Sequence, residues 1–120
     1  MEKYKKVVGD FGEQLIKKYL AAKGYEILGV KIKIGYQEID IVARQNNKII
    51  FVEVKTRTSG MLGAPEEAMG NQKIKNLKKA MEAYALVHNH DFDELRGDLI
   101  AVIIDKQKKI ANIKHYKDVF

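Results

Sequence analysis

The 120-residue chain contains no cysteine and only one proline, Pro65. Without cysteine it has no disulfide scaffold, no cysteine-ligated zinc or iron–sulfur site and no thiol nucleophile. Its three histidines, His88, His90 and His115, form neither an HExxH pair nor another recognisable zinc spacing. The longest apolar run, Leu99–Ile104, is far shorter than the roughly 20 residues that cross a bilayer. The composition therefore excludes disulfide-built, thiol-dependent and helical membrane proteins.

The N-terminal segment, residues 1–6, also lacks the apolar stretch of a secretory signal. With 46% hydrophobic residues, residues 1–120 are expected to form a single cytoplasmic domain with a core of its own and no membrane partner. The 22 lysines and arginines exceed the 16 aspartates and glutamates, which gives a formal net charge of +6. A basic domain of this size favours polyanionic partners, nucleic acid first among them.

Apolar periodicity predicts two helices and five strands in the order α-β-β-β-α-β-β. The helices are expected over residues 7–23 and 66–88, with apolar stripes formed by Val8, Phe11, Leu15, Ile16, Tyr19 and Leu20 in the first and by Ile74, Leu77, Met81 and Tyr84 in the second. The strands are expected over residues 25–34 (with an irregularity near Gly29), 38–44, 48–56, 99–104 and 110–116, and residues 57–65 are expected to form a loop. This order is typical of an α/β or α+β domain with a mixed central sheet flanked by helices.

The second and third strands are expected to form a hairpin that turns at Asn46-Asn47, because asparagine tolerates the positive φ of tight turns. Opposing residues then have numbers that sum to 93. One face of the hairpin is apolar in this register, with three opposing pairs: Ile39 with Val54, Ile41 with Val52, and Ala43 with Ile50. The other face sets Asp40 opposite Glu53 and Glu38 opposite Lys55.

Opposed side chains on paired strands lie about 4.5–5.5 Å apart at Cβ, so Asp40 against Glu53 is destabilising unless something neutralises the pair. A divalent cation, a shared proton and the neighbouring Lys55 are the alternatives. These charges could also lie on a solvated strand face and pair with one another. Since Val42 and Phe51 share that face, we expect it to be partly covered, and carboxylates in a covered cleft are candidates for a functional site.

This arrangement of Asp40, a hairpin and Glu53-Val54-Lys55 resembles the D…(D/E)xK signature of the restriction-endonuclease-like nucleases, the PD-(D/E)XK superfamily. More narrowly, the chain resembles the YraN-type family of small bacterial proteins, which are similar to archaeal Holliday-junction resolvases. The resemblance covers nearly the whole chain through Gly12-Glu13, Tyr19-Leu20, Glu38-Ile39-Asp40, residues 51–57, Gln72-Lys73, Arg96-Gly97-Asp98, His115 and Phe120. The chain departs from the family at Gln37, where glycine is usual, and at Gly97, where phenylalanine is usual.

The resemblance implies a restriction-endonuclease-like fold and a Mg²⁺-dependent endodeoxyribonuclease, with Mn²⁺ as a substitute ion. Asp40 and Glu53 would hold the metal, with the Val54 carbonyl as a further ligand. Lys55 would orient or help to deprotonate the attacking water and would stabilise charge on the phosphate. A bound metal and a lysine suit phosphodiester hydrolysis, which needs an activated water and stabilisation of phosphoryl charge.

The resemblance adds two further residues to the implied catalytic set. Glu13 matches a helix carboxylate that completes the acidic cluster and joins the metal ligands, and the apolar Ile16 and Leu20 place it on the buried flank of its helix. Gln72 matches a glutamine at the start of the second helix. Contacts to the nucleic-acid backbone are expected from Lys75, Lys78, Lys79 and Arg57, and from the N-terminal lysines Lys3, Lys5 and Lys6.

The sequence thus predicts a single nuclease-like domain that cuts branched or otherwise structured DNA. RNA is left open as a substrate. A homodimer is left open as the assembly, because two strands must be cut. The alternative is a nucleic-acid-binding protein of the same fold with little or no catalytic activity.

Overall fold

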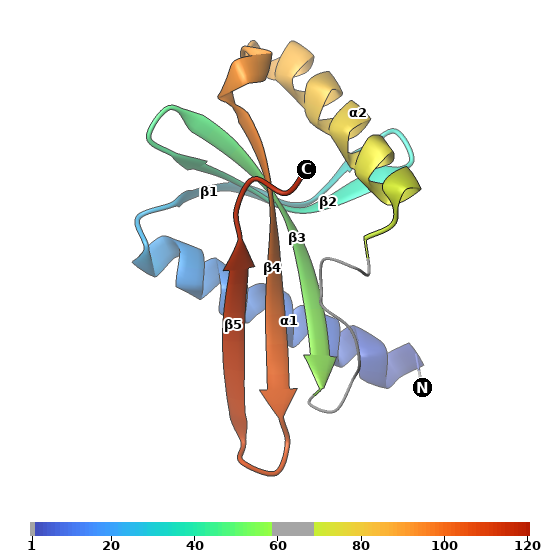
Figure 1. The fold of residues 1–120 in the computed structure, drawn as a ribbon, viewed down its shortest axis with the longest axis vertical. Helices are drawn as coiled ribbons and strands as arrows, with labels where there is room; N and C mark the ends of the chain where they lie inside the picture. The colour runs from blue at the N-terminus through green and yellow to red at the C-terminus, as the bar shows by residue number, and fades with distance from the viewer. Residues whose placement is uncertain (1, 59–68) are drawn as a thin grey trace.

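The computed structural model describes residues 2–58 and 69–120, with the side chains of residues 9–58 and 69–120. Two long helices and a five-stranded sheet make up this part of the chain (Figure 1). Their bounds are α1 Glu2–Ala22, β1 Glu26–Ile34, β2 Gln37–Gln45, β3 Lys48–Thr58, α2 Asn71–His88, the short 3₁₀ helix η2 Phe92–Glu94, β4 Leu95–Asp105 and β5 Ile110–Tyr116. The predicted α+β class and element order are confirmed. Within these ranges, no helix combines the length and apolar character needed to cross a membrane.

The strands of the mixed sheet follow one another in sequence order, β1-β2-β3-β4-β5. The β3–β4 pair is parallel, and the other three pairs are antiparallel. The connection from β3 to β4 includes α2, which packs on one face of the sheet, and α1 packs on the other face (Figure 1). A strand between two such layers is apolar on both sides, and residues 99–102 of β4 are indeed all buried.

The sheet contacts α1 through a line of residues one turn apart. Ile16 and Leu20 are fully buried, and a Cβ at Gly12 would collide with the Thr56 side chain of β3. Phe11, predicted to lie in the apolar stripe, is 50% exposed, so that prediction is wrong. The contact line runs through residues 12, 16 and 20, because the small Gly12 lets the helix approach β3 closely. In α2 the predicted stripe is confirmed: Leu77, Met81 and Tyr84 are buried, and Ile74 packs beside them.

Several helix and strand boundaries in the structure differ from the predicted ones. The first helix begins at Glu2 rather than at residue 7, and β3 continues to Thr58, which places Arg57 in a strand rather than in a loop. Helix α2 begins only at Asn71, because Gly70 has extended backbone angles (φ −69°, ψ 162°) and precedes the first helical residue. Strand β4 begins at Leu95 and ends at Asp105, longer than predicted at both ends. Residues 59–68, which include most of the predicted loop and the predicted start of the second helix, lie outside the described part of the chain.

The β2–β3 hairpin has the predicted register near its turn. Asn46 adopts φ +55°, and the paired residues run from Gln45–Lys48 to Ile41–Val52. The ladder ends there, so the predicted opposition of Asp40 with Glu53, of Ile39 with Val54 and of Glu38 with Lys55 does not occur as strand pairing. Beyond this point β2 pairs with β1 alone among the described strands, and Ile39 packs on the α2 face while Ile41 packs on the α1 face. The prediction of one continuous apolar face from Ile39 onward is therefore wrong.

Candidate functional site

Asp40 and Glu53 come together where β2 separates from β3. Asp40 is the first residue beyond the last paired position, and its Oδ2 accepts a hydrogen bond from the backbone N–H of Val54, at 2.8 Å. The side chain thus takes the place that a strand carbonyl would occupy in a continued ladder. The Asp40 and Glu53 carboxyl groups lie close enough for the charge of Glu53 to act on Asp40. The end of the ladder therefore brings the two carboxyl groups together.

The environment of this pair opposes two negative charges. Burial, and next the neighbouring Glu53 carboxylate, raise the pKa of Asp40 from 3.8 to about 7, although the Val54 amide acts in the opposite direction. Glu53 is buried, and its Oε2 has no hydrogen-bond partner among the described residues. The Nζ atom of Lys73, on α2, lies 3.7 Å from that oxygen, which is a long ion pair. Two negative charges at this pair are therefore unfavourable unless one of them is neutralised.

Glu13 approaches the pair from α1. Burial, and next the Asp40 charge, raise the pKa of Glu13, although Lys31 lies 3.6 Å from its Oε2. Lys31 also contacts Asp10, at 3.1 Å. The predicted position of Glu13 on a covered flank of its helix is confirmed, and its side chain is 17% exposed. Glu13 is electrostatically coupled to Asp40, but Glu13, Asp40 and Glu53 do not form a group whose carboxylate oxygens all lie within 4.8 Å.

Among the described residues, one such compact acidic group occurs, Asp91, Asp93 and Glu94 around η2. Asp91 and Asp93 are exposed, and Glu94 is half-buried, as is usual for acidic residues that face water.

Lys55 follows Glu53 by two residues on β3, so both side chains project from the same face of the strand. Lys55 is half-buried, and within the described ranges no residue makes an ion pair or hydrogen bond with its ammonium group. Two residues further along, the Nε of Arg57 is buried and has no described acceptor. The lysines Lys75, Lys78 and Lys79 are exposed on α2, as expected for residues that contact a polyanion.

Gln72 does not reach the acidic pair. It is exposed, and its Nε2 donates to Asn76 Oδ1 one turn along α2, at 3.0 Å. The next residue, Lys73, contacts Glu53 instead. The sequence indicates this difference, because Lys73 precedes the buried Leu77 by four residues and therefore lies on the side of α2 that faces the sheet. Gln72 does not lie on that side. Lys73 and Lys31 are the neighbours of the acidic site that the sequence analysis missed.

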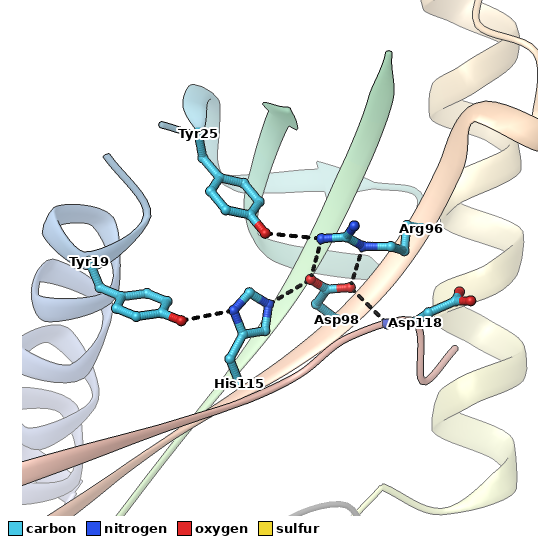
Figure 2. A network of polar contacts seen from close by, with 6 residues as sticks. All are labelled: Tyr19, Tyr25, Arg96, Asp98, His115 and Asp118. Carbon is cyan, nitrogen blue, oxygen red and sulfur yellow. Dashed lines mark hydrogen bonds and ion pairs between the residues drawn. The ribbon is translucent and has the colours of Figure 1, made fainter. Parts of the chain in front are cut away.

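A second buried carboxylate, Asp98 on β4, lies at the centre of a hydrogen-bond network (Figure 2). The Nε and an Nη atom of Arg96 donate to its two oxygens at 2.9 and 3.0 Å, and the Asp118 amide donates at 3.0 Å. His115 Nε2 lies 2.6 Å from the carboxylate, and its Nδ1 lies 3.1 Å from the Tyr19 hydroxyl of α1. The same Arg96 Nη also donates to the Tyr25 hydroxyl, at 3.1 Å. The network therefore connects α1, the start of β1, β4, β5 and the segment after β5.

The Asp98 carboxylate is stabilised in its charged form. Burial alone would raise the pKa of Asp98, but hydrogen bonds from His115, from Arg96 and from the Asp118 amide outweigh it and hold the pKa below its ordinary value.

Gly97, between Arg96 and Asp98, makes room for Phe120: a Cβ there would collide with the Phe120 ring and would lie 2.6 Å from its backbone oxygen. The amides of Val119 and Phe120 both approach the Gly97 carbonyl, at 2.7 and 3.3 Å.

Comparison with known proteins places this chain in a family. The model described as "Uncharacterised protein family UPF0102" matches residues 12–102. The chain belongs to the UPF0102 family. It is 39% identical over 113 residues to a UPF0102 protein of Syntrophomonas wolfei, covering 94% of this chain and 96% of the relative. It is 41% identical over 113 residues to a UPF0102 protein of Alkaliphilus oremlandii, covering 92% and 97% respectively.

UPF0102 membership confirms the resemblance to the YraN-type family. The matched segment contains Glu13, the Asp40–Glu53 pair and Lys55, and it ends before His115 and Phe120. The name UPF0102 gives the family and no reaction, so any chemistry must be argued from the geometry of the acidic site.

Proposed function

We propose that this UPF0102 protein is a metal-dependent DNA endonuclease that hydrolyses phosphodiester bonds. The observation that carries the proposal is the Asp40–Glu53 pair. A half-buried carboxyl group with a raised pKa lies beside a buried one, and the buried one has an oxygen with no described hydrogen-bond partner. A purely structural pair would be expected to have donors for its oxygens.

The residues of the pair fit a hard divalent cation. Mg²⁺ prefers carboxylate and carbonyl oxygens and needs few protein ligands. Asp40 and Glu53 would hold it, with the Val54 carbonyl as a further ligand and Glu13 as an outer carboxylate. When bound, a metal of this kind supplies an activated water and stabilises charge on the phosphoryl oxygens. Mn²⁺ offers the same chemistry.

Two lysines of the chain have distinct roles in the proposed reaction. Lys55 is a compact positive charge two residues from Glu53, and because no described group pairs with it, it can orient the attacking water and contact the scissile phosphate. Lys73 is a positioning residue, since it contacts the Glu53 carboxylate that would bind the metal. The exposed lysines of α2 would contact neighbouring phosphates, and a homodimer would supply two active sites for cutting two strands.

The test is cleavage of a panel of labelled DNAs (branched, nicked, duplex and single-stranded) with Mg²⁺ or Mn²⁺. We expect the wild-type protein to cut at least one of them. Glu53→Gln and Lys55→Ala should lose at least about 100-fold in rate, as is typical when a group that acts in the transition state is removed. Glu82→Gln, at an exposed carboxylate of α2, is the matched control and should cut at the wild-type rate.

Thermal melts of each variant show whether the fold is kept. Lys73→Met should lower the rate less than Lys55→Ala does, and Gln72→Ala should leave it unchanged. Cleavage by Glu53→Gln at the wild-type rate contradicts the assigned mechanism. If the wild-type protein binds these DNAs and cuts none of them with either ion, the protein is a nucleic-acid-binding member of the fold rather than a nuclease.

A further inference from the structure

Tyr36, in the turn between β1 and β2, is the most exposed large hydrophobic side chain in the described part of the chain. Gly35, with φ +62°, allows the tight turn that presents it. Beside it lies a groove of about 450 Å³ between this turn and α2, which run close together (Figure 1). Its lining comes from Ile34, Gly35, Tyr36 and Gln37 on the turn and from Asn76, Lys79, Ala80 and Ala83 on α2.

The groove offers four kinds of contact. An exposed phenol ring offers a flat face for stacking, and the amides of Gln37 and Asn76 offer hydrogen-bond donors and acceptors. The small side chains of Ala80 and Ala83 make the α2 wall of the groove shallow and apolar. Lys79 adds positive charge, and α2 as a whole carries Lys73, Lys75, Lys78 and Lys79 against the single acid Glu82. A flat, polar-edged ring attached to a phosphate chain matches this combination.

We propose that the groove binds an unpaired nucleobase of DNA, which stacks on Tyr36 while Lys79 and its neighbours on α2 contact the adjoining phosphates. This inference rests on the proposed function and adds substrate selection to it. Stacking on exposed aromatic side chains beside a basic surface is a general way of holding single strands, and it tolerates any base sequence. Bases in an intact duplex are stacked on one another and do not present a free face to Tyr36.

The position of Tyr36 relative to the acidic pair supports this role. Asp40 follows Tyr36 by four residues at the beginning of β2, which corresponds to about 13 Å of extended chain. A strand whose base is held at Tyr36 can therefore reach Asp40 and Glu53 within a few nucleotides. The protein would then select DNA in which an unpaired base lies next to the bond to be cut.

The chain contains no tryptophan, so Tyr36→Trp places a single fluorescent reporter in the groove. We would add, in EDTA and at low salt, a single-stranded DNA, a duplex of the same sequence, a matching RNA strand and an abasic strand of equal length. Binding is followed separately by anisotropy of a label on the nucleic acid. Single-stranded DNA should quench the tryptophan emission, whereas the abasic strand should bind through its phosphates without quenching. Phe92→Trp, at a half-exposed aromatic beyond the other end of α2, is the control and should respond weakly to every strand.

Affinity supplies a second readout in the otherwise native chain. Tyr36→Ser should weaken binding of single-stranded DNA by roughly 5- to 150-fold, the usual contribution of one stacked base, while Tyr36→Phe should stay within about twofold of wild type. Equal quenching by the abasic strand, or DNA binding with no quenching and no loss in Tyr36→Ser, overturns the base site and leaves the nuclease proposal standing. Tighter binding of the RNA strand overturns the assignment to DNA. Absence of binding to every strand overturns the base site, whereas the nuclease proposal is overturned separately, by absence of cleavage with Mg²⁺ and with Mn²⁺.

Discussion

Two buried carboxylates on neighbouring strands of this sheet have opposite surroundings. Glu53 of β3 pairs with Leu99, and Asp98 of β4 pairs with Val52, so the two acids lie one residue apart in the ladder and project to opposite faces. Asp98 receives four donor contacts, two from Arg96 and one each from His115 and the Asp118 amide. Glu53 has an oxygen with no described hydrogen-bond partner and lies beside a second carboxyl group, that of Asp40.

The difference separates two uses of buried charge. Where donors surround a carboxylate, as at Asp98, its pKa falls and the ionised group stabilises the fold. Where burial is joined by a neighbouring carboxyl group, as at Asp40, the pKa rises and the folded state contains unfavourable charge repulsion at neutral pH. The first arrangement joins segments of the chain, and the second destabilises the fold unless one of the two charges is neutralised. Substitutions at the two sites should therefore have effects of opposite sign.

Asp98→Ala should have the largest effect. Removing one member of a buried, hydrogen-bonded ion pair typically costs about 3–5 kcal/mol, because the partner charge is left uncompensated. We expect a loss of this size in urea or thermal unfolding. Asp93→Ala, at an exposed acid on η2, is the control and should change stability by less than about 0.5 kcal/mol. A loss below 1 kcal/mol in Asp98→Ala would show that the network in Figure 2 does not stabilise the fold.

Asp40→Asn should act in the opposite direction. Asparagine can still accept from the Val54 amide, its NH₂ group can donate to Glu53, and one of two adjacent negative charges is removed. We expect the metal-free variant to gain on the order of 1–3 kcal/mol at pH 8, and we expect no cleavage. In EDTA it should also bind DNA more tightly than wild type and gain less from added Mg²⁺. Unchanged DNA affinity with and without metal would contradict the metal site.

The pH profile of stability sharpens the comparison. Because the folded-state pKa of Asp40 is raised to about 7, the folded protein holds a proton between about pH 4 and 7 that the unfolded chain has released. The free energy of unfolding of the wild type should therefore fall as pH rises through this window. Asp40 contributes at most about 1.4 kcal/mol per pH unit to this fall, and Asp40→Asn should lack that contribution. The lowered pKa of Asp98 acts oppositely: its contribution is complete above the ordinary pKa and is lost as pH falls below about 4. Chemical denaturation from pH 3 to 8 measures both.

Gly97→Ala tests how closely the segment after β5 packs on β4. An added Cβ meets the Phe120 ring and backbone oxygen, so we expect a loss of about 1–3 kcal/mol, as is typical of overpacking. Gly9→Ala is the matched control, because a Cβ there meets nothing within 4 Å. If Phe120→Ala is combined with Gly97→Ala, part of the loss should disappear. A double variant no less destabilised than the sum of the two would show that Phe120 is not the group in the way.

The sequence predicted the elements, their order and the register near the Asn46 turn, because local periodicity and turn chemistry determine them. It placed Asp40 beside Glu53 for a reason that proved only partly right: the ladder ends before them, and the Val54 amide holds Asp40 through its side chain. The position at which β2 stops pairing with β3 depends on the whole sheet. The sheet face on which Ile39 packs could therefore not be predicted from the alternation of apolar and polar residues.

Other features depended on contacts between distant segments. The helical periodicity of α2 indicates that Lys73, rather than Gln72, lies on the face toward the sheet. It does not indicate that Lys73 contacts Glu53, because Glu53 lies on a different element, β3. Gly97 has no side chain and so leaves room for Phe120, and no local sequence pattern relates these two residues.

The antiparallel β2–β3 hairpin has a consequence for the order of folding. Asp40 and Val54 are separated by 14 residues, and Asp98 and its donors by 2 to 20, whereas Tyr25 and Tyr19 contact Arg96 and His115 across 71 and 96 positions. Closing short loops costs less chain entropy, so local contacts form early and those across the parallel β3–β4 crossover form late. The acidic pair and the donors of Asp98 should therefore assemble before Tyr19 and Tyr25 join the network. Substitutions at Tyr19 should chiefly raise the unfolding rate, because contacts absent from the transition state act on that step.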